Sequence, residues 1–263
     1  SFAGMGVTID RLLEIADLPE QRSGTAAFSS GRVSLQGVSL VQGAHSILKR
    51  VTIDVEQGQH VAIVGPSGAG KSSLASLLPR FYDATAGRIM IADNPIGDIR
   101  IGELRKSVCL VPQDSFLTHA SLRENITLNC GDVDPSFLEK VVSTVQLSDL
   151  VERLPDGLDT IIGYRGFPVS GGERQRICLA RGLLQDAEIL ILDEALSGVD
   201  IEMERQILAD VRRSCASKNL FVITHRVRSV MDFDRLIVLE SGVVIASGPP
   251  NKVAGNYSPS AVG

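Results

Sequence analysis

Residues 61–72 read VAIVGPSGAGKS, and this stretch decides the fold. A short apolar strand at 61–64 runs into a glycine-rich turn, and a helix is predicted over 72–81. The glycines let backbone N–H groups approach phosphate closely, and the helix start adds positive potential. Lys71 is expected to neutralise the charge of the β- and γ-phosphates, and the Ser72 hydroxyl to bind Mg²⁺. A glycine-rich turn that binds no ligand is the weaker interpretation, because the turn is preceded by the predicted strand and followed by the predicted helix.

A second apolar strand, ILIL at 189–192, ends in two carboxylates, Asp193 and Glu194. Burying two carboxylates at a strand end is costly unless they meet a cation or take part in chemistry. Asp193 is expected to hold Mg²⁺ directly or through water, and Glu194 to polarise an attacking water. The structural alternative is an ordinary N-cap for the next helix.

A Ser170-Gly171-Gly172 turn precedes a predicted basic helix. A hydroxyl and free N–H groups at a helix start can bind an anion, but such turns are common and weak evidence alone. Together with the first two segments, the turn indicates part of a nucleotide site.

Two polar residues follow predicted strands. Gln113 comes after the strand at 108–111, and His225 after the strand at 220–224. Alone, a solvated loop glutamine and a structural histidine are the commoner interpretations. At the same sheet edge as Asp193, they become candidates to contact Mg²⁺, the attacking water or the γ-phosphate.

The alternation of strands and helices predicts an α/β fold with a mostly parallel central sheet around the phosphate loop. Residues 33–40 and 47–55 predict an N-terminal antiparallel β subdomain, and 121–185 an inserted helical block. Further strands are expected at 88–91, 188–192 and 236–239, helices at 7–16, 201–215 and 228–231, and a closing hairpin around 243–246. The predicted division is a linker at 1–30, a nucleotide-binding domain at 31–253 with its helical subdomain at about 115–185, and a flexible tail at 254–263.

The composition and charge of the chain narrow the classes of function that it could have. The 263 residues carry a net charge of −5, which argues against sequence-independent nucleic-acid binding. The four cysteines are scattered without a disulfide-like framework, which is typical of reduced thiols. No apolar run reaches the ~18 residues of a transmembrane helix, and no secretory signal is apparent.

In this order, the motifs resemble the nucleotide-binding domain of an ABC transporter of the exporter type, over about residues 7–253. Exporter-like stretches at 11–15, 101–105, 111–114 and 117–126 support the subtype. By this resemblance Gln113 is the Q-loop glutamine, Glu194 the catalytic glutamate and His225 the switch histidine, with Lys71 assisting catalysis. The remaining matched residues are the Walker A loop (Gly65, Pro66, Ser67, Gly68, Ala69, Gly70, Lys71, Ser72, Ser73), the signature motif at 169–173 (with Ser170, Gly171, Gly172 and Glu173), Walker B at 189–193 with the metal-binding Asp193, and the D-loop at 197–200 with Asp200.

The resemblance implies a mechanism. Two such domains would sandwich two ATP molecules with Mg²⁺, each between one copy's Walker A loop and the other's signature motif. Hydrolysis would release the dimer and drive a transmembrane domain of the same polypeptide, at the cytoplasmic face of the inner or plasma membrane. Both halves of the composite site are present, so a homodimer is the economical expectation, and no nucleic acid is expected as partner.

Some positions depart from the family pattern. Exporters usually stack adenine on an aromatic residue where this chain has Gln42, and no aromatic lies between Phe28 and Phe81. Losing that stacking, worth about 1 kcal/mol, predicts weaker ATP affinity or looser base selectivity. The signature has Val169 and Glu173 in place of Leu and Gln, and Tyr164 stands where exporters commonly carry a coupling Glu.

Three alternatives remain open at this point: a soluble cassette protein acting on ribosomes or DNA, an importer ATPase that docks on separate permeases, and an unrelated phosphate-loop kinase or GTPase. The last leaves the Ser170–Gly172 turn unexplained. The sequence does not identify an exported substrate.

Overall fold

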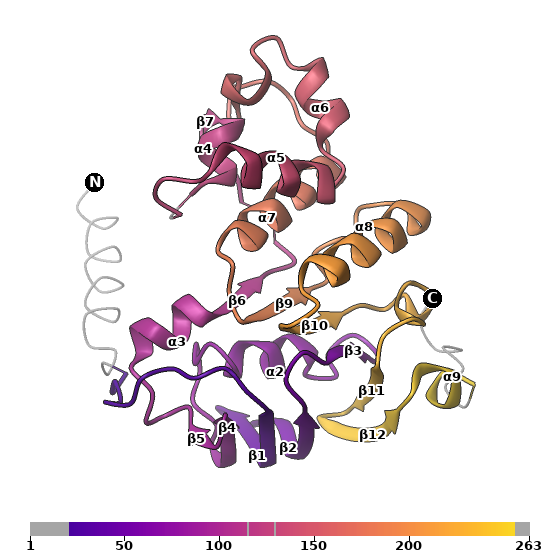
Figure 1. Ribbon diagram of the computed structural model, residues 1–263. Coiled ribbons are helices and arrows are strands. Elements are labelled where there is room, and N and C mark those ends of the chain that lie inside the picture. The colour runs from indigo at the N-terminus through magenta and orange to yellow at the C-terminus, as the bar shows by residue number, and fades with distance from the viewer. Residues whose placement is uncertain (1–20, 115, 129, 256–263) are drawn as a thin grey trace, which may run out of the picture.

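A six-stranded central sheet organises the molecule (Figure 1). The computed structural model describes residues 21–114, 116–128 and 130–255. The strand order is β12-β11-β3-β10-β9-β6. These strands are β3 (His60–Val64), β6 (Val108–Val111), β9 (Ile189–Asp193), β10 (Asn219–Ile223), β11 (Arg235–Glu240) and β12 (Val243–Gly248). All neighbours pair in parallel except β12, which closes the sheet as an antiparallel hairpin with β11.

The central strands are buried along their whole length, because both faces of the sheet are covered. Alternate residues enter two different cores. Ala62 and Val64 face the core that contains α7 (Gly171–Leu184) and α8 (Ile201–Ser214). Val61 and Ile63 face the core that contains α2 (Lys71–Leu77) and the N-terminal sheet. The sheet is therefore the layer shared by both halves of the molecule.

The N-terminal sheet is antiparallel, in the order β2-β1-β4-β5. Its strands are β1 (Val33–Gln42), β2 (His45–Val55), β4 (Ala86–Ile91) and β5 (Asn94–Pro95), and α3 (Ile101–Ser107) follows. Within the predicted linker, residues 24–28 are bound to this part: the Ala26 N–H donates to Asp98 O at 2.8 Å, and the Phe28 N–H to Glu103 Oε2 at 2.9 Å.

The helical block stands apart from the sheets at the top of Figure 1 and is joined to them through α7. It contains α4 (Leu122–Ile126), α5 (Pro135–Thr144), α6 (Ser148–Arg153) and the 3-10 turn η1 (Gly157–Asp159). A two-residue strand pair, β7 (Ala120–Ser121) with β8 (Ile161–Ile162), also lies there. The pattern of residues 121–185 did not predict this pair, since two residues show no periodicity.

The predicted fold class is confirmed, with local corrections. The helix expected over 72–81 ends at Leu77 and continues only as turns, because Pro79 has no N–H to extend it. The segment at 228–231 is a 3-10 turn, η2 (Val227–Val230), and α9 (Pro250–Val253) follows β12. The expected helix at 7–16 lies outside the described residues. Within the described part of the chain, no helix has the length and apolarity to span a membrane.

Candidate functional site

The phosphate-loop segment leaves β3 and enters α2 in a tight path. Gly65 has φ 154°, and a β-carbon there would lie 1.9 Å from Leu239 O, so only glycine fits against β11. Gly68 and Gly70 also have positive φ, 76° and 97°. The buried Lys71 ammonium donates to Gly65 O at 2.9 Å and to Pro66 O at 3.0 Å. The loop is thus curled around the lysine head group.

Asp193 lies at the end of β9, beside this loop. Burial raises the pKa of Asp193, as does the neighbouring Glu194 charge, while a hydrogen bond with Ser72 and the Lys71 charge oppose the rise. Its buried Oδ1 accepts no hydrogen bond from any residue that the structure describes.

The residues at this point fit a magnesium ion. An unsatisfied buried carboxylate oxygen next to a hydroxyl is the kind of donor set that Mg²⁺ takes, with substrate phosphates and water as its other ligands. No group of three or more His, Cys, Asp or Glu side chains that could hold a metal occurs among the described residues.

Three candidate residues from separate parts of the chain meet at the carboxyl ends of adjacent strands. Gln113 Nε2 donates to Glu194 Oε2 at 3.3 Å, and His225 Nδ1 lies 3.8 Å from the same oxygen. Glu194 has φ 48°, and its N–H donates to Ile223 O at 3.0 Å. The strained backbone directly after β9 presents this carboxylate between the ends of β6 and β10. Parallel α/β sheets place their ligands at this edge.

The signature-motif residues form the start of α7. Ser170 and Glu173 make a reciprocal capping box: the Glu173 N–H donates to Ser170 Oγ at 3.2 Å, and the Ser170 N–H to Glu173 Oε2 at 2.7 Å. Arg153 Nη2 also binds Glu173 Oε1, at 2.5 Å. Ser170 and Gly171 are exposed, and a β-carbon at Gly171 would have no atom of the described residues within 4 Å. The turn is therefore fixed by its own hydrogen bonds and open to solvent on its outer side.

The sequence patterns did not predict the contacts that join the D-loop to α7. Gln175 Nε2 donates to Ser197 Oγ at 2.9 Å, and the Gly198 N–H donates to Gln175 Oε1 at 2.7 Å. Asp200 caps α8 by accepting the Met203 N–H at 2.9 Å. A glutamine inside a basic helix carries no local signal for such a contact.

Gln42 lies at the tip of the β1–β2 hairpin, directly opposite His45. Both side chains are exposed. Further along β2, Ile47 O would lie 3.1 Å from a β-carbon at Gly70, so this strand passes over the phosphate loop. The hairpin is thus a neighbour of the loop, and neither Gln42 nor His45 is a Phe, Tyr or Trp.

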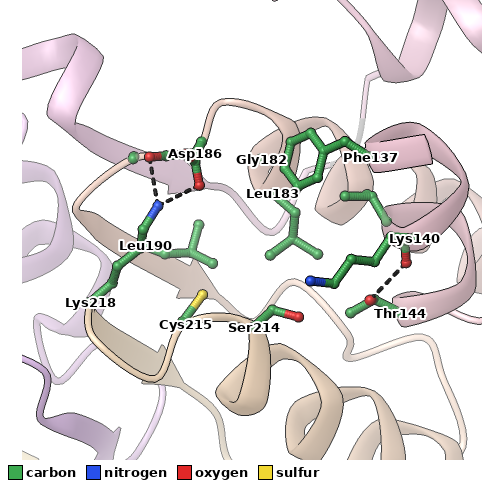
Figure 2. Close-up of a pocket in the computed structure, with 12 residues that line it drawn as sticks. Phe137, Lys140, Thr144, Gly182, Leu183, Asp186, Leu190, Ser214, Cys215 and Lys218 are labelled. Carbon is green, nitrogen blue, oxygen red and sulfur yellow. Dashed lines mark hydrogen bonds and ion pairs between the residues drawn. The ribbon is translucent and has the colours of Figure 1, made fainter. Parts of the chain in front are cut away.

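A separate cavity of about 170 Å³ lies between α5, α7 and the end of α8 (Figure 2). Lys218 Nζ crosses one side of it to Asp186, 2.5 Å from Oδ1, and the Lys140 side chain points into it. None of the residues predicted from the motifs lines this cavity. It is therefore distinct from the candidate nucleotide site.

Comparisons with known proteins agree with this geometry. A profile described as "ABC transporter" matches residues 48–197, more than half of the chain. The chain is 39% identical over 239 residues to an ATP-dependent lipid A-core flippase of Chromohalobacter salexigens, covering 90% of this chain and 41% of that protein. It is 40% identical over 208 residues to the mitochondrial iron-sulfur clusters transporter ATM1 of Candida glabrata, covering 78% of this chain and 29% of that one.

A solved structure of a bacterial Atm1-family ABC exporter with ATP bound superposes with a TM-score of 0.87 at 31% identity, covering 96% of this chain and 46% of the other. The chain thus spans less than half of the relatives that it matches. The motifs, the sheet edge on which they meet and these similarities agree, so the chain belongs to the ABC transporter family, as an ATPase domain homologous to those of exporter-type transporters.

Proposed function

We propose that this chain is the motor domain of an ABC exporter, which closes against a second copy around two ATP molecules. The observation that carries the proposal is the convergence of Gln113 and His225 on one oxygen of Glu194. A carboxylate held by two polar side chains at this edge can accept a proton from an attacking water. The names of the flippase, the transporter and the exporter favour export over the other uses of such a domain.

The roles follow from position. Lys71, already inside the loop, would bind the β- and γ-phosphate oxygens, and the loop N–H groups would bind the remaining charge. Ser72 and Asp193 would hold Mg²⁺, with Gln113 offering a further oxygen. When bound, Mg²⁺ would supply positive charge against the negative charge that develops on the phosphates. Glu194 would orient the water and take its proton, and His225 would hold Glu194 or contact the γ-phosphate. Gln42 would lie near the adenine.

The second half of the site would come from a partner. The open turn at Ser170–Gly172 can donate N–H groups to a phosphate bound by another copy, and Asp200 would lie at the same interface. Because this chain holds both halves, a homodimer is proposed. The predicted division into linker, ATPase domain and tail, a transmembrane domain of the same polypeptide and a place at the cytoplasmic membrane face are parts of the same proposal.

Light scattering of the purified chain tests the sandwich. Four proteins are measured in the presence of ATP, once with Mg²⁺ and once with EDTA. They are the wild type, Glu194→Gln, Lys71→Ala and the exposed control Glu139→Gln. Glu194→Gln should become a stable dimer with ATP, because it binds nucleotide and cannot hydrolyse it. Wild type and the control should remain largely monomeric under turnover, and Lys71→Ala should not respond.

The outcomes separate the parts of the proposal. A Glu194→Gln variant that binds ATP and stays monomeric contradicts the homodimer. If Glu194→Gln hydrolyses ATP at the wild-type rate, the proposed role of Glu194 is contradicted. Absence of ATP binding in the wild type contradicts the nucleotide site itself.

A further inference from the structure

Arg226, the residue after His225, is the centre of a hydrogen-bond network next to the candidate site. Its Nη1 donates to Val199 O at 2.6 Å and to Glu204 Oε2 at 2.7 Å, and its Nη2 donates to Ser197 O at 2.8 Å. One guanidinium therefore joins the segment after β10, the D-loop and helix α8.

The network is buried and polar. The Glu204 side chain is 4% exposed and that of Arg226 is 21% exposed. Thr224 Oγ1 donates to Glu204 Oε1 at 3.4 Å and accepts the Arg226 N–H at 3.0 Å. A carboxylate at this depth is tolerated only when it is paired, so Glu204 and Arg226 depend on each other.

The same D-loop is also bound from its other side. Gln175 of α7 binds Ser197 Oγ and the Gly198 N–H, as described above. The D-loop is therefore attached both to the helix that begins with the signature turn and, through Arg226, to the segment that carries His225.

His225 itself is weakly attached. Its side chain is half exposed, and its contact with Glu194 is long, 3.8 Å. Glu194, His225, Glu204 and Thr224 all line one small cavity of about 10 Å³, room for roughly one water. Two members of the Arg226 network, Glu204 and Thr224, therefore share a cavity with the Glu194–His225 pair. Because Arg226 directly follows His225 in the chain, a shift of Arg226 would move His225.

We propose that Arg226 is a positioning residue for ATP hydrolysis, which holds His225 against Glu194 by anchoring the segment after β10 to the D-loop and to Glu204. The inference rests on the proposed function, because it needs His225 to act in hydrolysis. Arginine is required since its planar fork reaches acceptors on two segments at once, whereas a lysine ammonium is a single point.

The test is a double-mutant cycle in ATP hydrolysis by this chain, using Arg226→Lys, His225→Ala and both together. The exposed Arg228→Lys is the matched control. Arg226→Lys should lower kcat roughly 10-fold or more with KM changed less than about 2-fold, because misplacement of a catalytic group acts on the chemical step. In the His225→Ala background, the same substitution should cost less than about 3-fold, because the group that it positions is gone.

Glu204→Gln provides a second variant in case Arg226→Lys is poorly folded, and should lower kcat in the same direction. Amide hydrogen exchange supplies a readout that needs no turnover. Arg226→Lys should speed exchange at Ser197–Val199, and Arg228→Lys should not.

Three results overturn the inference: an unchanged kcat in folded Arg226→Lys, an equal fold-loss with and without His225, or unchanged exchange of the D-loop amides. If His225→Ala alone retains the wild-type kcat, the proposed role of His225 fails instead, and the exchange experiment still decides whether Arg226 anchors the D-loop.

Discussion

Replacing Gly65 by alanine should destabilise the fold more than replacing Gly68, although both belong to the same loop. A β-carbon at Gly65 would lie 1.9 Å from Leu239 O, one residue beyond the last parallel pair of β3 with β11, Val64 with Val238. A β-carbon at Gly68 would meet no described atom within 4 Å, so only the positive φ of 76° is strained there.

The magnitudes follow from these two environments. At Gly68, the left-handed backbone costs an L-residue about 1–2 kcal/mol. At Gly65, backbone strain of about 1–3 kcal/mol adds to about 1–3 kcal/mol for forcing two packed strands apart. We therefore expect about 2–6 kcal/mol for Gly65→Ala, a fall in Tm of roughly 2–4 °C per kcal/mol.

Urea unfolding of the two variants beside wild type measures the difference, and a fluorescent ATP analogue measures binding. Gly68→Ala should fold with modest loss and bind the analogue more weakly, since its β-carbon points into open space by the loop. If Gly65→Ala is no less stable than Gly68→Ala, then β11 does not pack on the phosphate loop as described, and the argument from close approach is refuted.

Three further outcomes are expected. Gln42→Tyr should tighten ATP binding about 5-fold by restoring about 1 kcal/mol of stacking, and an unchanged Kd by titration would place the base elsewhere. Asp193→Asn should raise Tm and abolish Mg²⁺-dependent hydrolysis. Burial raises the pKa of Asp193, so its ionised form costs stability once the pH rises through the raised pKa. A fall in the Tm of the variant at pH 7 would contradict this. Although burial opposes it, the Ser170 N–H and Arg153 lower the pKa of Glu173. The free energy of unfolding of the wild type should therefore exceed that of Glu173→Gln by about 1 kcal/mol at pH 7. This advantage is present above pH 4.5 and is lost as the pH falls through the lowered pKa of Glu173. Urea unfolding at pH 7 and pH 4 tests this, and a difference that does not change with pH speaks against it.

Some features could be predicted because they are local. The strand–loop–helix of residues 61–72 and the apolar strand before Asp193 depend on neighbouring residues, so their conformation and chemistry are visible in a short window. The errors are local too. Pro79 ends α2 early, and the two-residue strands β7 and β8 are too short to leave a period.

Tertiary structure alone decided which residues meet. Gln113 and Glu194 are 81 positions apart, and they touch because β6 and β9 are neighbours in a sheet whose order differs from the order of the chain. The contacts of Arg226 and Gln175 with the D-loop likewise depend on how β10 and α7 pack, and no spacing in the sequence predicts them. Residue type and local pattern thus determined the phosphate loop and the chemistry available at this site, since backbone geometry and side-chain polarity act over a few residues. The pairing of strands and the burial of Glu204 beside Arg226 decided how that chemistry is held, since contacts between distant segments exist only once the whole sheet has formed.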